Sequence, residues 1–516
     1  MNLELKKKIG QLLIAGFPSP EVDDQARRLI DDFYVGNFAF FGRNIVSPAQ
    51  TSKLCSDLTQ LVYEKTGFAP FICADQEGGV VTRVNLGASL MPGTMSVTAS
   101  GTEEAYQLGA NNGKVIRTLG LSCTFAPILD VNLEPMNPII GSRAFGDDPD
   151  VVAKHGIPMA LGFQSSNILP SVKHFPGHGN VATDSHLAVP YNNTKREILE
   201  ETEWKPFYEA FAQGVDGLMT CHVVYNDVDP KWPATLSYEI MTKLLREKMH
   251  FDGLALTDCM EMDAIRAAFG TGEGAVRALE AGCDLLTFSH TYEAVSSAAN
   301  AIYEAIESGR LTEERIDLSY NRVMRYKEKY GLLETRVFDV EEARKEAYDP
   351  AKLELNRQVS LDSMTLISGS LDALKNAKKP AFFAPASIAL TGAEDKERVP
   401  NYFSDRAAER FGGTSTVIPL NELDEATKEA MNGDYDVAVL GLYNARFRKG
   451  QQEVLRAFEE NGRPLIVVLL GAPYDKSLVT RCDGLICAYE YTELAVATVI
   501  EAMAENRFPG KLPIKQ

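Results

Sequence analysis

The sequence contains neither a long apolar run nor a cysteine pattern that would cross-link the chain. A helix needs about 18 or more consecutive apolar residues to span a bilayer, and no such run occurs. The eight cysteines are scattered, with no C-x-x-C pair among them. We therefore expect no membrane span, and buried reduced thiols rather than a disulfide framework or a zinc site.

Positive charge is also scarce. Lysine and arginine number 52 against 71 aspartates and glutamates, which gives a formal net charge of −19. No cluster of basic residues offsets this excess, and nucleic acids and anionic membranes repel a protein of the same sign. The composition therefore argues against both as partners. The 45% of hydrophobic and 24% of charged residues are typical of an ordinary globular protein.

The beginning of the sequence lacks the pattern of a secretory signal. Three lysines precede an apolar stretch, but this stretch contains glycine and glutamine and has no convincing small-residue cleavage site. We expect residues 9–17 to form the first strand of the fold. The scattered cysteines agree with a cytoplasmic location.

Short apolar runs alternate with helical patterns over the first part of the chain. Near-continuous hydrophobicity is typical of a parallel strand that is covered on both faces. The expected strands fall at residues 9–17, 35–42, 71–75, 123–131, 169–174, 217–222, 253–258 and 284–289. Helical patterns fall at residues 23–33, 48–65, 103–119, 151–167, 195–213, 238–249, 272–281 and 292–307. Eight such units predict a (β/α)₈ barrel, although a doubly wound sheet uses the same alternation.

A smaller α/β domain is expected after the barrel. Helical pattern continues over residues 311–330, and the charged residues 334–349 show little apolar periodicity. Further strand-like runs follow at residues 381–384, 437–442, 465–470 and 484–488. We predict a catalytic barrel domain over residues 1–333, a linker over 334–352 and a layered α/β sheet domain over 353–516.

One loop rich in glycine and proline gathers residues that are suited to catalysis. Three of the seven histidines, His174, His178 and His186, fall on it together with Lys173 and Asp184. Glycine and proline let the backbone turn sharply beside a ligand, and an imidazole titrates near neutral pH. A metal site formed by the three histidines and Asp184 stays an alternative, although Lys173 would repel a divalent cation.

Polar residues also follow several other expected strands. They are Asp75, Asp130, His222 and Asp258, and the active site of a barrel is assembled from the carboxyl ends of its strands. Asp75 opens a double-glycine loop and is a candidate ligand for sugar hydroxyls. Asp258 is a candidate nucleophile, although an aspartate there also suits the N-cap of the next helix. Arg143 is a candidate forked donor to a polar ligand.

These segments resemble bacterial β-N-acetylglucosaminidases of glycoside hydrolase family 3. The Lys-His-Phe-Pro-Gly-His-Gly segment with Asp-x-His resembles the N-acetylhexosaminidase branch of the family rather than its β-glucosidases. The terminal Gly-Lys-Leu-Pro-Ile resembles the end of the family's second domain. The other similar segments are Lys-Ile-Gly-Gln-Leu-Leu, Asp-Gln-Glu-Gly-Gly, Phe-Ala-Pro-Ile-Leu-Asp-Val, Ile-Gly-Ser-Arg-Ala-Phe-Gly, Met-Thr-Cys-His and Thr-Asp-Cys-Met.

The resemblance implies a role for each candidate. Asp258 would be the nucleophile and His186 the acid/base, oriented by Asp184. The residues expected to bind the substrate are Asp75, Arg143, Lys173, His174 and His222. Val80 and Asn180 depart from the family pattern, in which arginine and aspartate are frequent at these positions. No metal or other cofactor is implied.

Together these features predict a retaining, exo-acting β-N-acetylglucosaminidase. Such an enzyme places a nucleophile on one face of the anomeric carbon and a proton donor near the leaving oxygen. Its partner would be a small carbohydrate, either a cell-wall muropeptide, as in peptidoglycan recycling, or a chitooligosaccharide. The alternatives are a phosphorylase that uses phosphate as acceptor, a metal-dependent barrel hydrolase and a non-catalytic sugar-binding protein. The oligomeric state is left open.

Overall fold

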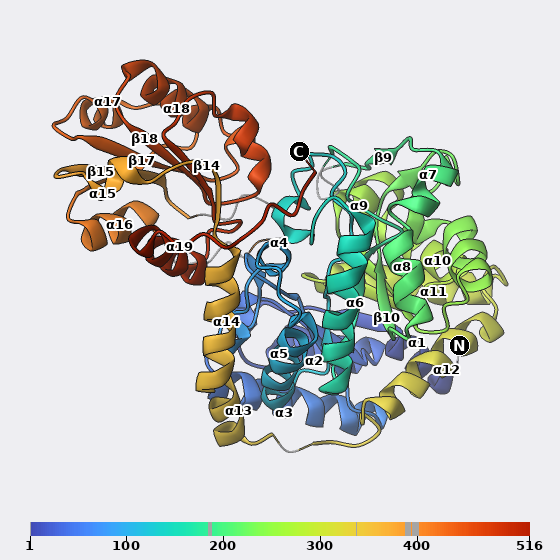
Figure 1. Cartoon of the computed structure of the whole chain (residues 1–516). Helices are drawn as coiled ribbons and strands as arrows, with labels where there is room; N and C mark the ends of the chain where they lie inside the picture. Colours follow the sequence, from blue (N-terminus) through green and yellow to red (C-terminus); the bar gives the residue numbers. More distant parts are fainter. Residues whose placement is uncertain (1, 184–187, 337, 388–393, 395–401, 516) are drawn as a thin grey trace.

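The computed structural model describes residues 2–183, 188–336, 338–387, 394 and 402–515. Figure 1 shows a large barrel surrounded by helices and a smaller domain, coloured orange to red, beside it. Helix α14 (Pro350–Ser363) lies along the side of the barrel and leads into the smaller domain. The end of the chain returns to the barrel, where the backbone N–H of Lys515 donates to the Asp147 carboxylate.

The described strands of the large domain form a closed parallel barrel. They are β1 (Leu13–Ala15), β2 (Asn37–Phe40), β3 (Phe71–Ala74), β6 (Cys123–Thr124), β7 (Leu169–Pro170), β8 (Val172–Phe175), β10 (Gly217–Thr220), β12 (Leu254–Cys259) and β13 (Leu285–Phe288). β7 and β8 are halves of one strand interrupted at Ser171, and they pair with β6 and β10. β1 pairs with both β2 and β13, so the first and last strands meet. The predicted barrel is confirmed.

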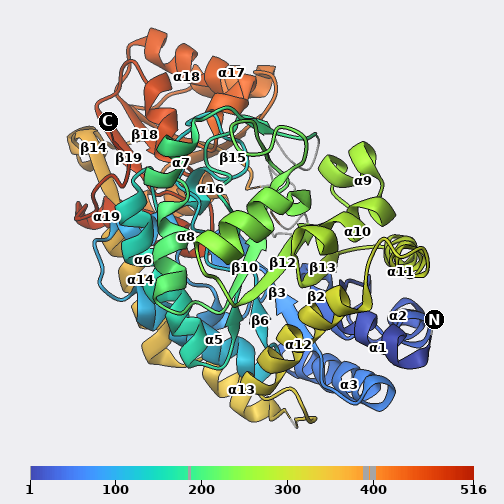
Figure 2. The ribbon, with the colours of Figure 1, turned by 90° about the vertical axis from the view of Figure 1, so that its right-hand side faces the viewer.

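Helices cover the outside of the barrel (Figure 2). The described helices of the large domain are α1 (Leu3–Gln11), α2 (Asp24–Phe33), α3 (Pro48–Thr66), α4 (Thr94–Ala99), α5 (Ala105–Leu119), α6 (Pro149–Ser165), α7 (Arg196–Glu201), α8 (Lys205–Ala212), a π-helical segment (Glu239–Lys248), α9 (Asp263–Phe269), α10 (Thr271–Ala281), α11 (Tyr292–Glu307) and α12 (Glu313–Lys329). The helix expected over residues 195–213 is divided into α7 and α8.

The expectation of one strand over residues 9–17 is wrong in its first part. Helix α1 occupies residues up to Gln11, and β1 has only three residues. The Asn2 side chain caps α1 by accepting a hydrogen bond from the Leu5 N–H at 2.8 Å. Leu5 and Ile9 are one turn apart and both buried, so a helix buries them on one face as well as a strand would.

The segment expected as a linker contains helical structure that packs on the barrel. Helix α13 (Val340–Ala347) lies within it, and α14 begins before its end. The Glu346 carboxylate of α13 pairs with Lys352 of α14 and, at 2.6 Å, with Lys114 of α5. These contacts tie the segment to the barrel, while the domain boundaries stay a prediction.

The smaller domain is a sheet covered by helices. Its strands are β14 (Thr365–Gly369), β15 (Pro380–Pro385), β16 (Thr414–Ile418), β17 (Val437–Leu442), β18 (Leu465–Leu469) and β19 (Gly484–Cys487), and its helices are α15 (Asp372–Lys375), α16 (Phe403–Phe411), α17 (Glu425–Met431), α18 (Lys449–Asn461) and α19 (Glu493–Glu505). All four predicted strands are present. The sequence missed β14 and β16, which lie at the two edges of the sheet and are partly exposed. None of the helices in the described ranges combines the length and apolar character that a membrane crossing requires.

A buried lysine closes the barrel at the end opposite the cavity described below. The Lys327 ammonium of α12 donates to the Gln11 side chain at 2.6 Å and to the carbonyls of Ala69 and Gly36 at 2.9 and 3.1 Å. These three acceptors carry no charge, and burial lowers the pKa of Lys327 to about 7. One side chain thus links the last barrel helix to the segments that precede β1, β2 and β3.

The low pKa of Lys327 predicts a stability that changes with pH. The unfolded chain, in which this amine keeps a pKa near 10.5, binds more protons than the folded protein between pH 7 and 10. The free energy of unfolding therefore rises with pH in that window, by up to about 1.4 kcal/mol per pH unit. In Lys327→Met this contribution is absent. The Tm of the wild type minus the Tm of the variant should therefore increase from pH 7 to pH 9. A constant difference would contradict the assignment.

Candidate active site

A cavity of about 720 Å³ lies at the carboxyl ends of the barrel strands. Five of the eight predicted site residues line it: Asp75, Arg143, Lys173, His174 and Asp258. Asp75 follows β3, whereas Lys173 and His174 belong to β8 and Asp258 to β12. Because the strands are parallel and the barrel is closed, residues far apart in sequence meet at one edge.

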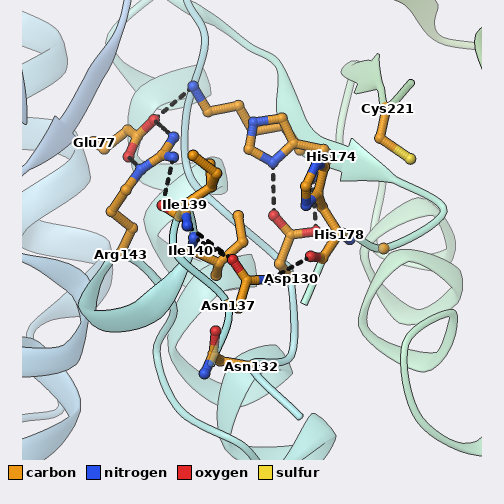
Figure 3. Close-up of polar contacts among 12 residues, drawn as sticks. Glu77, Asp130, Asn132, Asn137, Ile139, Ile140, Arg143, His174, His178 and Cys221 are labelled. Atoms are coloured by element: carbon orange, nitrogen blue, oxygen red, sulfur yellow. Dashed lines mark hydrogen bonds and ion pairs between the residues drawn. The ribbon is translucent and has the colours of Figure 1, made fainter. Parts of the chain in front are cut away.

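Glu77 is the centre of an ion-pair cluster beside the cavity. The Arg143 guanidinium donates two hydrogen bonds to its carboxylate, at 2.7 and 2.9 Å (Figure 3). The Lys173 ammonium lies 2.6 Å from Glu77 and 2.6 Å from Asp75, so it bridges the two carboxylates. Forked pairing of this kind fixes orientation as well as distance. The two cations therefore have defined positions before any ligand binds.

These partners keep the buried carboxylates ionised. Burial alone would raise the pKa of Glu77, but Arg143 and Lys173 outweigh it and lower the pKa to about 2. For Asp75 burial is likewise outweighed, by Lys173 and Arg83, and its pKa is lowered. Burial would lower the pKa of Lys173, but the same two carboxylates raise it. The cluster thus stays charged across the neutral range.

Asp130 orients His174 at the end of β8 and His178 in the loop that follows it. Its buried carboxylate lies 2.6 Å from the Nδ1 atom of His174 and accepts the backbone N–H of His178 at 2.6 Å (Figure 3). Burial would raise the pKa of Asp130, but both histidines lower it. Burial and the neighbouring His174 lower the pKa of His178 to about 4, so that ring is neutral at pH 7.

Asn137 holds the loop that carries Arg143. Its side-chain oxygen accepts the backbone N–H groups of Ile139 and Ile140, both at 2.9 Å, and its amide donates to the His178 carbonyl at 2.8 Å (Figure 3). The amide therefore joins the loop that carries Arg143 to the loop between β8 and β9 (residues 176–190), which we call the histidine loop. A short-range sequence pattern carries no sign of such a contact.

Asp258 is half-buried at the end of β12 and faces the cavity. Its Oδ1 atom accepts the backbone N–H of Cys259 at 2.7 Å, and its negative charge acts on the ring of His178. The next helix, α9, has Met262 as its N-cap residue. The interpretation of Asp258 as a helix cap is therefore wrong.

One described site prediction, His222, does not line the cavity. His222 is fully buried, with its ring nitrogens 2.8 Å from the Thr235 hydroxyl and 3.1 Å from the Cys259 carbonyl. It supports the strand end that carries Asp258. Asp184 and His186 lie outside the described residues.

Arg83 is a cavity residue that the sequence analysis missed. Its guanidinium lies 3.2 Å from the Asp75 carboxylate and over the ring of Phe41, at 5.5 Å from the centroid. It comes three residues after Val80, the position at which the family pattern often has an arginine. A search for arginine within one hairpin of the double glycine could have found it.

The smaller domain contacts the loops that surround the cavity. Glu490 accepts the backbone N–H of Gly93 at 3.0 Å, and a Cβ atom on Gly79 would lie 2.6 Å from its carboxylate. Arg446 donates to the Pro135 carbonyl at 3.0 Å, and Glu394 reaches the cavity wall itself. The second domain therefore supports the site from outside the barrel.

The described side chains do not form a metal site. Within the ranges given above, no group of three or more His, Cys, Asp and Glu side chains is arranged to hold an ion. His174 already places one ring nitrogen against Asp130. Of the proposed ligands, His174 thus already has a carboxylate partner.

Several known proteins are similar to this chain. A solved β-N-acetylglucosaminidase of glycoside hydrolase family 3 from Paenibacillus sp. str. FPU-7 is 35% identical, with a TM-score of 0.91 over 100% of this chain and 99% of that one. A β-hexosaminidase from Methylococcus capsulatus is 32% identical over 293 residues, which are 56% of this chain and 84% of that protein. β-Hexosaminidase A from Pseudoalteromonas piscicida is 31% identical over 328 residues. The match covers 58% of this chain and about half, 54%, of the length of that protein.

The family profile agrees with the fold and with the position of the cavity. The glycosyl hydrolase family 3 N-terminal domain matches residues 4–326, which run from α1 to the last turn of α12 and include every barrel strand. Asp75, Lys173 and Asp258 all lie within this range. The chain belongs to glycosyl hydrolase family 3.

Proposed function

We propose that this protein is an exo-acting β-N-acetylhexosaminidase that removes terminal β-linked N-acetylglucosamine with retention of configuration. One observation carries the proposal: Asp258 and the cluster around Glu77 face a single cavity at the barrel mouth. The 35% identity to a β-N-acetylglucosaminidase along the whole chain supports the same substrate.

The cluster suits a neutral, hydroxyl-rich ring. Lys173 and Arg143 present N–H donors, and Asp75 presents carboxylate oxygens that accept hydrogen bonds from hydroxyls. All three are already held by charged neighbours, so little reorganisation is needed when the ring binds. Exo action is part of the proposal and rests on the similarity to a β-N-acetylglucosaminidase.

The reaction assigned to the site has two steps. In the first, an Asp258 carboxylate oxygen attacks the anomeric carbon while His186 gives a proton to the leaving oxygen. In the second, His186 takes a proton from water, and the resulting hydroxide displaces Asp258. Asp184 would orient the imidazole and stabilise its charged form, as a carboxylate does in a serine-protease triad. These roles follow from the resemblance and stay proposals.

The location and the leaving group are part of the same proposal. All eight cysteines fall in the described ranges and are free, most of them buried, which suits a reducing, cytoplasmic compartment. Substrates there would be imported muropeptides or chitooligosaccharides. Release of N-acetylglucosamine from muropeptides would place the enzyme in peptidoglycan recycling.

Replacement of Asp258 tests the nucleophile. In Asp258→Asn, kcat should fall by about 10³-fold or more, because the amide cannot form the covalent intermediate. Tm should change little, since Asp258 is half-buried and does not cap α9. Steady-state kinetics beside a thermal melt will measure both. Near-normal kcat in a destabilised variant would reduce Asp258 to a structural role.

The substrate class is tested with p-nitrophenyl β-glycosides in the presence and absence of phosphate. The N-acetylglucosaminide should exceed the glucoside in kcat/KM by about 10²-fold or more, because a site built for the acetamido group loses those contacts with glucose. Mass spectrometry of the products should show free N-acetylglucosamine under both conditions. Equal rates on both sugars would reject the proposed substrate, and N-acetylglucosamine 1-phosphate would indicate a phosphorylase.

A further inference from the structure

Glu203 is a buried carboxylate that lies outside the cavity. It sits between α7 and α8 and has no exposed surface. The Asn192 side-chain amide donates to both of its oxygens, at 3.1 and 3.2 Å. Asn192 ends the short strand β9 (Tyr191–Asn192), which pairs with β11 (Val224–Tyr225) near α7 (Figure 1). Glu203 therefore holds the chain where it returns from the histidine loop.

The same side chain lies against the start of that loop. A Cβ atom on Gly177 would be 2.7 Å from the Glu203 Cβ atom and 3.3 Å from its Oε1 atom, and the φ angle of Gly177 is +136°. Only glycine allows the chain to pass this close with such a backbone. The Tyr225 hydroxyl donates to the Gly177 carbonyl. The outgoing limb thus contacts both Glu203 and Tyr225 at Gly177.

A further contact joins the two limbs directly. The Asn180 amide donates to the Thr194 hydroxyl at 2.9 Å, and the Asn192 side-chain oxygen accepts the Thr194 N–H at 2.9 Å. The segment between these contacts includes Asp184 and His186, which lie outside the described residues. Its two described ends, however, are both set by the position of Glu203.

We propose that Glu203 is a positioning residue that fixes both ends of the histidine loop and thereby aligns the acid/base of the reaction. This inference rests on the proposed glycosidase function. Glu203 touches neither the cavity nor the assigned nucleophile, so its effect on catalysis is indirect. It predicts a defect in proton transfer rather than in formation of the sugar pocket.

The charge state of Glu203 defines the matched control. Burial raises its pKa to about 8, helped by the negative charge of Asp130 and opposed by hydrogen bonds from Asn192. The phenol of Tyr225 also interacts with it electrostatically. At pH 7 the side chain is mainly a neutral acid, and glutamine has nearly the same shape and also accepts a hydrogen bond. Glu203→Gln should therefore keep the loop in place, whereas Glu203→Ala should release it.

The test compares two aryl N-acetyl-β-glucosaminides that differ in their need for an acid. 2,4-Dinitrophenolate is a stable anion and leaves without protonation, whereas the phenyl glycoside needs a general acid to protonate its leaving oxygen. Glu203→Ala should lower kcat/KM for the phenyl glycoside about tenfold more than for the 2,4-dinitrophenyl glycoside. Glu203→Gln should restore the wild-type ratio of the two rates. A purely structural role would lower both rates in the same proportion.

Two further variants make the result decisive. The buried Asp216 carboxylate accepts a hydrogen bond from the Tyr330 hydroxyl at 2.5 Å, at the end of the barrel opposite the cavity. Asp216→Asn should lower Tm without changing the ratio of the rates on the two glycosides. If Glu203→Ala fails to fold, Asn192→Ala breaks the same contact and should shift the ratio in the same direction. An unchanged ratio in the folded variants overturns the inference. Absence of activity in the wild type on both substrates would instead reject the proposed function.

Discussion

Glu77 is a buried carboxylate that holds Arg143 and Lys173 at the same time, and one wall of the cavity is arranged around these two contacts. An isolated buried charge costs several kcal/mol, and loss of one partner from a buried pair costs about 3–5 kcal/mol. The three residues come from the β4 (Gln76–Gly78) hairpin, the loop after β6 and strand β8. Each segment therefore depends on the other two for its place, and the pocket forms as a unit.

The second domain extends this dependence beyond the barrel. Glu490 packs against Gly79, in the turn of the hairpin that carries Glu77, and against Gly93. Arg446 bonds the carbonyl of Pro135 in the loop that leads to Arg143. The walls of the pocket are thus barrel loops, but their outer faces are covered by the other domain. This arrangement gives that domain a part in the site, and Glu394 at the cavity wall agrees with it.

The sequence predicted the barrel because parallel strands buried on both faces leave continuous apolar runs. It predicted much of the cavity because polar residues at the ends of such runs, Asp75 and Asp258 among them, meet at one edge of a closed barrel. It could not predict edge strands such as β16, whose side chains are half-exposed. His222 shows the other limit, because a residue just beyond a strand end can turn toward a neighbouring strand instead of the cavity. Contacts such as Arg143 to Glu77 join residues 66 positions apart, and only the fold brings them together.

The paired charges also decide how substrates reach the site. Lys173, Arg143 and Arg83 balance Asp75, Glu77 and Asp258, so the cavity exerts little net field on an approaching molecule. The chain as a whole carries a formal net charge of −19. Of the two proposed substrates, an uncharged chitooligosaccharide would arrive by diffusion alone, at a rate that is indifferent to salt. An anionic muropeptide would be repelled until mobile ions screen the charge of the protein, with a screening length of about 8 Å at physiological ionic strength. Ionic strength would thus select between the two classes of substrate at the stage of encounter, before any residue of the pocket is touched.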